Sequence, residues 1–76
     1  MIENIIDIKD FRISFAAARV NAKLTQSEVS KMLKISNKTL IEIEKYRKDI
    51  SVEMLNEMQK IYNVPDKDLF LIKKSN

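Results

Sequence analysis

The side chains that could perform chemistry in this chain are hydrogen-bonding and charged groups, because the usual reactive groups are missing. The 76 residues include no cysteine and no histidine. Their absence excludes disulfides, thiolate nucleophiles, the common zinc sites and a histidine general base. No remaining combination supplies an activated nucleophile or a tuned acid–base pair. The sequence therefore predicts a protein that is not an enzyme, with no cofactor, no metal and no evident small-molecule substrate.

Charge is distributed unevenly along the chain, although the net charge is only +3. Residues 31–48 carry a local charge of +4, and residues 49–68 carry a local charge of −3. The charged side chains of the first segment are Lys31, Lys34, Lys38, Lys45, Arg47 and Lys48, against Glu42 and Glu44. Such asymmetry suits a basic face that meets phosphates. An ordinary solvated surface explains the same pattern, so other features must separate the two interpretations.

Helix start and stop signals divide the chain into five short helices, which predicts an all-α fold. The first helix is expected from Asp10, as N-cap, to about Ala22, with a buried face at three- and four-residue intervals. That face consists of Phe11, Phe15, Ala18 and Ala22. The fourth helix follows Ser51 and ends at Asn63, because asparagine tolerates a left-handed conformation and a proline follows closely. A last short helix is expected from Asp66 to about Leu71.

The segment between the first and fourth helices carries the strongest signal. Thr25 and Glu28 have the spacing of a capping box, which predicts a second helix that ends near Leu33. Ser36 caps a third helix, and only residues 34–35 connect it to the second. Two helices joined so tightly must cross steeply and pack at a fixed angle. The apolar residues available for that packing are Val29, Leu33, Ile35, Leu40 and Ile43.

Taken together, these residues resemble the lambda-repressor-like or Cro-like (XRE-type) helix-turn-helix domains of phage and bacterial regulators. The likeness covers about residues 15–70 of a single domain spanning 1–76, with 1–9 and 71–76 as terminal extensions. It rests on the opening Thr25–Val29, the step Ile35–Ser36, the positions Leu40 and Ile43–Glu44, and the ending Val64–Phe70. The resemblance implies a compact five-helix domain.

The resemblance also implies one structural ion pair, between Arg19 of the first helix and Glu44 at the end of the third. Four positions depart from the family pattern: Ser30 stands where alanine is usual, Lys34 and Tyr46 stand where glycine is usual, and Ile50 stands where proline is common. A left-handed conformation at Lys34 would cost roughly 1 kcal/mol, which a lysine that reaches a phosphate could justify.

In such domains the third helix enters the major groove of double-stranded DNA, and its exposed first turn reads the bases. The expected base-reading residues are Asn37, Lys38, Thr39 and Glu42, whose groups can match adenine, guanine, thymine and cytosine respectively. Asn37 and Lys38 are the stronger candidates, because a merely solvated polar face explains Thr39 and Glu42 equally well. Phosphate contacts are expected from Gln26, Ser27, Lys34, Lys45, Tyr46, Arg47 and Lys48. Gln26 matches the family's usual phosphate-contacting glutamine.

The function expected from this resemblance is transcriptional regulation, as a repressor that occupies an operator in the cytoplasm. The apolar stretch 1–8 lacks a basic region and contains two acids, which argues against a signal peptide or membrane span. The largely apolar stretches 5–8 and 69–72 are expected to meet either each other or a second subunit, and a homodimer would read a palindromic operator. An antitoxin-type autoregulator is an alternative with the same fold. A helical protein-interaction adaptor is the alternative of another class, and it predicts no salt-dependent DNA affinity.

Overall fold

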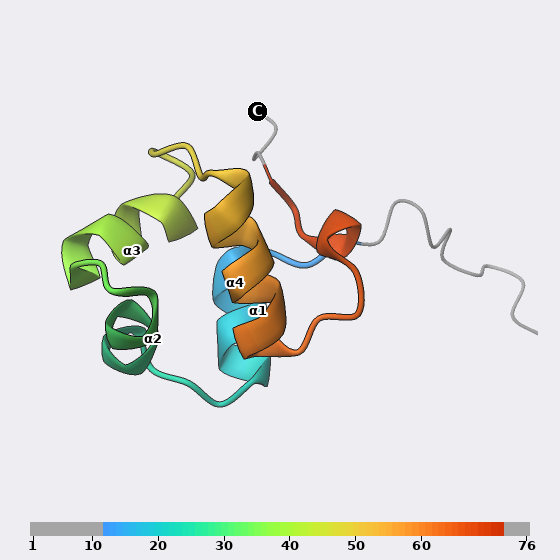
Figure 1. The fold of residues 1–76 in the computed structure, drawn as a ribbon, viewed down its shortest axis with the longest axis horizontal. Helices are drawn as coiled ribbons and strands as arrows, with labels where there is room; N and C mark the ends of the chain where they lie inside the picture. Colours follow the sequence, from blue (N-terminus) through green and yellow to red (C-terminus); the bar gives the residue numbers. More distant parts are fainter. Residues whose placement is uncertain (1–11, 73–76) are drawn as a thin grey trace, which may run out of the picture.

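Residues 12–72 are described by the structure, a computed structural model, and they form four α-helices and one turn of 3-10 helix (Figure 1). The helices are α1 (Phe15–Asn21), α2 (Gln26–Leu33), α3 (Asn37–Glu44) and α4 (Val52–Tyr62), and the 3-10 turn is η2 (Lys67–Leu69). In Figure 1, α1 and α4 lie side by side, and α2 and α3 form one end of the domain. The all-α prediction is confirmed. None of these described helices is long and apolar enough to cross a bilayer.

Each α-helix begins at a hydroxyl N-cap that accepts a hydrogen bond from a backbone N–H three residues later. The caps are Ser14, Thr25, Ser36 and Ser51. The capping box predicted at the start of α2 is confirmed: Thr25 Oγ1 accepts from the Glu28 N–H at 3.1 Å, and Glu28 Oε1 accepts from the Thr25 N–H at 2.8 Å. Because each cap contributes about 1 kcal/mol, the starts of α2, α3 and α4 are determined largely by local sequence.

The start of α1 differs from the prediction. The helix begins at Phe15, after the N-cap Ser14, and not near Asp10. Tertiary pairing explains the difference, because Ile13 is extended and forms an isolated parallel bridge with Phe70. The Ile13 N–H donates to the Leu69 carbonyl at 2.8 Å, and the Ile13 carbonyl accepts from the Leu71 N–H at 2.8 Å. Asp10 and Phe11, assigned above to this helix, lie outside the described residues.

The prediction of a fifth helix from Asp66 to about Leu71 is wrong as well, because the chain forms only the three-residue turn η2 in this segment. Asp66 caps this turn through Oδ1, which accepts from the Asp68 N–H at 2.9 Å. Phe70 then becomes extended, with φ −77° and ψ 141°, and its side chain enters the core. A continued helix would remove the backbone pairing with Ile13, so the bridge and the burial of Phe70 end the helical turn.

The core is built from α1, α2, α3, α4 and the C-terminal segment. Its buried apolar residues are Phe15, Ala18, Val29, Leu40, Ile43, Met58, Tyr62 and Phe70. Phe70 lies 5.2 Å from Phe15 and 6.4 Å from Tyr62 between ring centroids, at tilted and edge-on angles that favour aromatic pairs. The apolar run 69–72, considered above for a dimer contact, therefore contributes its largest side chain to the interior of its own domain.

A residue with positive φ follows each of the four α-helices, although the chain contains no glycine: Lys23, Lys34, Tyr46 and Asn63. Lys34 has φ 59° and ψ 42° at the end of α2, and Asn63 has φ 56° and ψ 43° at the end of α4. Both positions adopt the conformation considered in the sequence analysis. After Lys34, the Ile35 N–H donates to the Ser30 carbonyl at 3.0 Å, which satisfies an end group of α2. This turn sets the direction in which α3 departs.

Candidate nucleic-acid interface

The pair α2 and α3 forms a rigid unit that presents the outer face of α3. Val29 of α2 and Leu40 and Ile43 of α3 are buried on the inner side of this unit. The connection between the helices consists of residues 34–36, and Ser36 accepts from the Thr39 N–H at 3.1 Å. Because the inner side is packed and the helix start is capped, the first turn of α3 has one fixed position relative to α2.

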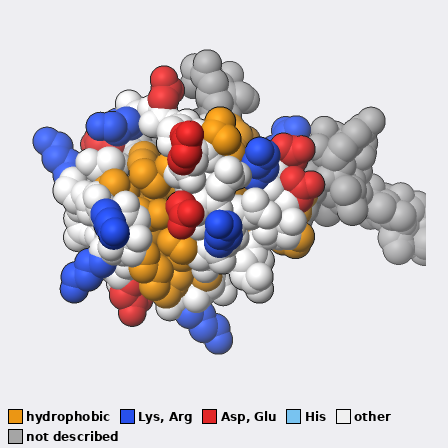
Figure 2. All heavy atoms as spheres, viewed as in Figure 1, with side chains coloured by type: hydrophobic (Ala, Val, Ile, Leu, Met, Phe, Trp, Pro, Cys, Tyr) orange, Lys and Arg blue, Asp and Glu red, His pale blue; other side chains and the backbone are white. Residues whose placement is uncertain are grey.

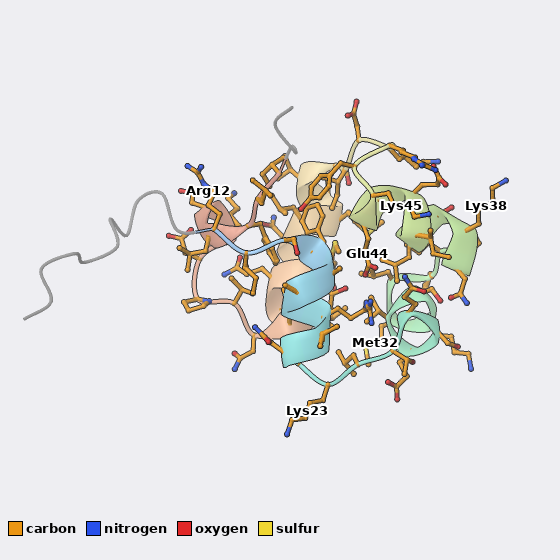
Figure 3. The ribbon with its side chains drawn as sticks, turned by 180° about the vertical axis from the view of Figure 1, so that it is seen from behind. Arg12, Lys23, Met32, Lys38, Glu44 and Lys45 are labelled. Carbon is orange, nitrogen blue, oxygen red and sulfur yellow. The ribbon has the colours of Figure 1, made fainter. Side chains whose placement is uncertain are left out.

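The first turn of α3 exposes two of the four expected base-reading residues. Asn37 and Lys38 are exposed, whereas Thr39 and Glu42 are half-buried. Figure 3 shows the Lys38 side chain extending away from the domain at the start of α3. The Thr39 hydroxyl accepts a hydrogen bond from Ser36 Oγ at 3.0 Å, so its orientation is tied to the cap. Asn37 and Lys38 are therefore the side chains with the freest access to a groove.

A hydrogen bond that the sequence analysis missed joins Asn37 to α2. The Ser30 hydroxyl lies 2.6 Å from Asn37 Oδ1 and 3.1 Å from the Ser27 carbonyl. Ser30 is only 4% exposed and is the buried polar residue of the described core. The available signal was a hydroxyl at an inward-facing position next to Val29, where the resembled family usually has alanine.

Arg19, Gln26 and Glu44 form a second polar network between α1, α2 and α3. Arg19 donates to Glu44 through Nε at 2.7 Å and through Nη2 at 3.3 Å, and its Nη1 donates to the Leu24 carbonyl at 3.0 Å. Gln26 Nε2 donates to Glu44 Oε1 at 2.9 Å. In Figure 3, Glu44 lies between α1 and α3. The side chains of Arg19 and Glu44 are only 14% and 6% exposed.

This network fixes the end of α3 and the start of α2 relative to α1. The hydrogen bond to Glu44 is the main influence that raises the pKa of the Arg19 guanidinium, while burial acts in the opposite direction. The raised pKa keeps the Arg19 guanidinium in its charged form, which is the form that pairs with Glu44. The bond from Gln26 to Glu44 was not expected from the sequence, because the two residues are 18 positions apart.

The remaining expected phosphate-contacting groups lie around α2 and α3. Lys34, Lys45, Arg47 and Lys48 are all exposed, as is Ser27, while Gln26 is half-buried. Figure 2 shows several basic side chains at the end of the domain that α2 and α3 form, and acidic side chains over α4. Glu44 is paired with Arg19, whereas no ion pair joins the half-buried Glu42 to a described residue. The six cations of residues 31–48 are all exposed.

The structure gives the Tyr46 side chain a different position from the expected one. Its ring stacks on Phe15 at a centroid distance of 5.5 Å. Its hydroxyl donates to the Leu71 carbonyl at 2.7 Å and accepts from the Phe15 N–H at 3.4 Å. Burial is the main cause that raises the pKa of this hydroxyl. Because the hydroxyl is engaged within the domain, we leave Tyr46 out of the phosphate-contacting set.

Over residues 12–72, no group of three or more acidic, histidine or cysteine side chains is arranged to hold a metal ion. The one buried side-chain polar atom of that region without a hydrogen-bond partner is the Tyr62 hydroxyl. Burial, followed by the nearby charge of Glu44, raises the pKa of Tyr62 above its usual range.

Comparison with protein families places residues 15–69 in one family. The matching family model is described as "Helix-turn-helix", and the match spans α1 through η2. Comparison with curated proteins and with solved structures gave no significant match. The family match covers more than two thirds of the chain and includes the α2–α3 unit described above.

Proposed function

Because the chain belongs to the helix-turn-helix family, we propose that it is a transcriptional repressor that places α3 in the major groove of an operator. The observation that carries the proposal is the exposed, capped first turn of α3, which presents Asn37 and Lys38 from a packed two-helix unit. The major groove of B-DNA admits one α-helix and offers a distinct donor and acceptor pattern for each base pair. We place this activity in the cytoplasm of a bacterial host.

In this proposal Asn37 and Lys38 supply base discrimination. An asparagine amide can bind adenine N6 and N7 together, and a lysine ammonium can donate to guanine O6 and N7. Each good contact of this kind discriminates by about 1 to 3 kcal/mol. Thr39 and Glu42 are half-buried and have a secondary role, in which the Thr39 methyl meets thymine and Glu42 accepts from cytosine N4.

Phosphate contacts come from two places beside the groove. The first is the start of α2, where a hydrogen bond to Glu44 positions the Gln26 side chain and the backbone N–H groups of the helix N-terminus can bind an anionic phosphate. The second is the exposed basic set Lys34, Lys45, Arg47 and Lys48. These contacts position the domain on the duplex without specifying its sequence.

The first experiment is selection of binding sites from a random duplex library with the whole chain, followed by titration of the selected duplex at several salt concentrations. Asn37→Ala together with Lys38→Ala should weaken binding to the selected duplex about 30-fold or more while leaving nonspecific binding nearly unchanged. Lys60→Ala is the matched control, because Lys60 is an exposed cation on α4 and not on the α2–α3 unit.

A recovered motif with a salt-dependent affinity, lost selectively in the double variant, supports base reading by α3. No enrichment from the library, with at most weak binding at low salt, contradicts the proposal. That result favours the protein-interaction adaptor instead.

We further propose that two copies bind one palindromic operator, with their α3 helices about 34 Å apart. Exposed apolar side chains on the surface, including Ile72 of the C-terminal segment, support this proposal. Sedimentation of the protein with and without the selected duplex tests this proposal. A mass of one chain in both conditions contradicts it.

A further inference from the structure

The buried hydroxyl of Ser30 contacts the first residue of the helix that the proposed function places in the groove. Ser30 is 4% exposed on α2, and its Oγ lies 2.6 Å from Oδ1 of the exposed Asn37 on α3. A side chain at the solvent-facing start of one helix is thus tied to the packed interior of another. This contact crosses the turn between α2 and α3, seven residues apart in the sequence.

The hydrogen-bond inventory around Ser30 determines which way the contact runs. A serine hydroxyl has one hydrogen, and two acceptors lie near it: Asn37 Oδ1 at 2.6 Å and the Ser27 carbonyl at 3.1 Å. The shorter distance lies within the range of an O–H···O bond and below that of an N–H···O bond. The hydroxyl therefore donates to Asn37 Oδ1, which fixes the amide with its oxygen toward α2.

This orientation leaves a usable set of groups on the Asn37 amide. Oδ1 has two lone pairs, and Ser30 occupies one of them. Both Nδ2 hydrogens remain without an acceptor among residues 12–72. One free acceptor and adjacent free donors match adenine, which offers N6–H as donor and N7 as acceptor, whereas guanine offers two acceptors at the same edge.

We propose that Ser30 is a positioning residue that holds the Asn37 amide for adenine recognition at one position of the bound DNA. The inference rests on the proposed function. It adds that Ser30, which does not itself contact DNA, contributes to base specificity through Asn37. Without the hydroxyl, Asn37 is exposed and free to change rotamer, so binding must immobilise it. Immobilising one such side chain weakens binding roughly 2- to 13-fold.

The test compares the whole chain with Ser30→Ala, Asn37→Ala and the double variant, each used in selection from a random duplex library. Every variant is then titrated against the duplex selected by the native chain and against duplexes with each base pair replaced in turn. Ser30→Ala should lose about 2- to 13-fold in preference for adenine at one base pair and keep its preference elsewhere. The double variant should behave like Asn37→Ala alone, because Ser30 acts through Asn37.

Two further measurements separate positioning from a general effect on folding. Thermal unfolding of Ser30→Ala should stay close to that of the native chain, because alanine suits a buried helix position and water can replace the hydroxyl at exposed Asn37. NMR of the free protein should show the Asn37 side-chain amide averaging over rotamers in Ser30→Ala but ordered in the native chain. Lys38→Ala reports on the proposed function itself, since the hydrogen bonds of the Ser30 side chain go to Ser27 and Asn37 and not to Lys38.

The outcomes are distinguishable. A native motif that needs Lys38, with Ser30→Ala selecting the same motif at undiminished preference, overturns the role of Ser30 and leaves the proposed function intact. A native chain that selects no motif overturns both. An adenine preference lost in Ser30→Ala, with an unchanged unfolding midpoint and a mobile Asn37 amide, supports the inference.

Discussion

Replacing Glu44 with alanine should destabilise the domain by about 3 kcal/mol. The substitution removes the acceptor of three hydrogen bonds, two from Arg19 and one from Gln26. Breaking a buried ion pair from one side costs roughly 3 to 5 kcal/mol, because the remaining charge is left without compensation. The lower end applies here, since Arg19 is 14% exposed and keeps its bond to the Leu24 carbonyl.

This loss is large relative to the total stability expected for the chain. A protein of 76 residues has an unfolding free energy of about 4 to 11 kcal/mol at ordinary values per residue. Urea unfolding followed by far-UV circular dichroism measures the change directly. With a slope near 1 kcal/mol per molar for a small domain, the unfolding midpoint should fall by about 3 M. The thermal midpoint should fall by roughly 12 to 24 °C.

Glu42→Ala is the matched control, because Glu42 is an acidic residue of the same helix, and no hydrogen bond joins its side chain to a described residue. Its effect should stay within about 0.5 kcal/mol. A double variant, Arg19→Met with Glu44→Leu, should recover most of the lost stability, because apolar pairs often replace buried ion pairs without loss. A change below 1 kcal/mol in Glu44→Ala, or no recovery in the double variant, would falsify the claim that an unpaired buried charge causes the loss.

Three other predictions concern local structure. Lys34→Gly should stabilise the fold by about 1 kcal/mol in urea unfolding, because glycine adopts the left-handed conformation without strain. A variant less stable than the native chain contradicts the strain argument. If Lys34 contacts a phosphate, the same substitution should reduce the salt slope of DNA binding by about 1. Thr25→Ala should lower the unfolding free energy by about 1 kcal/mol, because it removes the capping box of α2. An unchanged unfolding midpoint contradicts this prediction. The pKa of Tyr62 is raised in the folded state, so above pH 10 its hydroxyl ionises more readily in the unfolded chain. Tyr62 should therefore lower the unfolding free energy by up to about 1.4 kcal/mol per pH unit above pH 10. Tyr62→Phe should be nearly neutral at pH 7 and should flatten this alkaline decline; an equally steep decline in the variant rules out Tyr62 as its source.

The sequence predicted the composition of the candidate site, but of its side-chain connections only the ion pair between Arg19 and Glu44, which the family resemblance implied, was expected. Asn37, Lys38 and the basic loop residues could be found because they follow a recognisable N-cap and carry exposed polar groups. The bonds from Ser30 to Asn37 and from Gln26 to Glu44 could not, because each depends on how closely α2 and α3 approach. The position of Tyr46 could not be predicted either. Its place in the loop after α3 indicated an exposed side chain, but its ring packs on Phe15.

The sequence by itself determined where α2, α3 and α4 begin and where α2 and α4 end. These features depend on interactions within a few residues, such as a hydroxyl cap, a capping-box glutamate or a left-handed asparagine. Only the tertiary structure decided the two ends of the described chain. The start of α1 and the end of η2 depend on the pairing of Ile13 with Phe70, whose backbones meet only after the intervening helices have packed. Such long-range pairing leaves no periodic signal in either segment, so local pattern alone predicted helix at both.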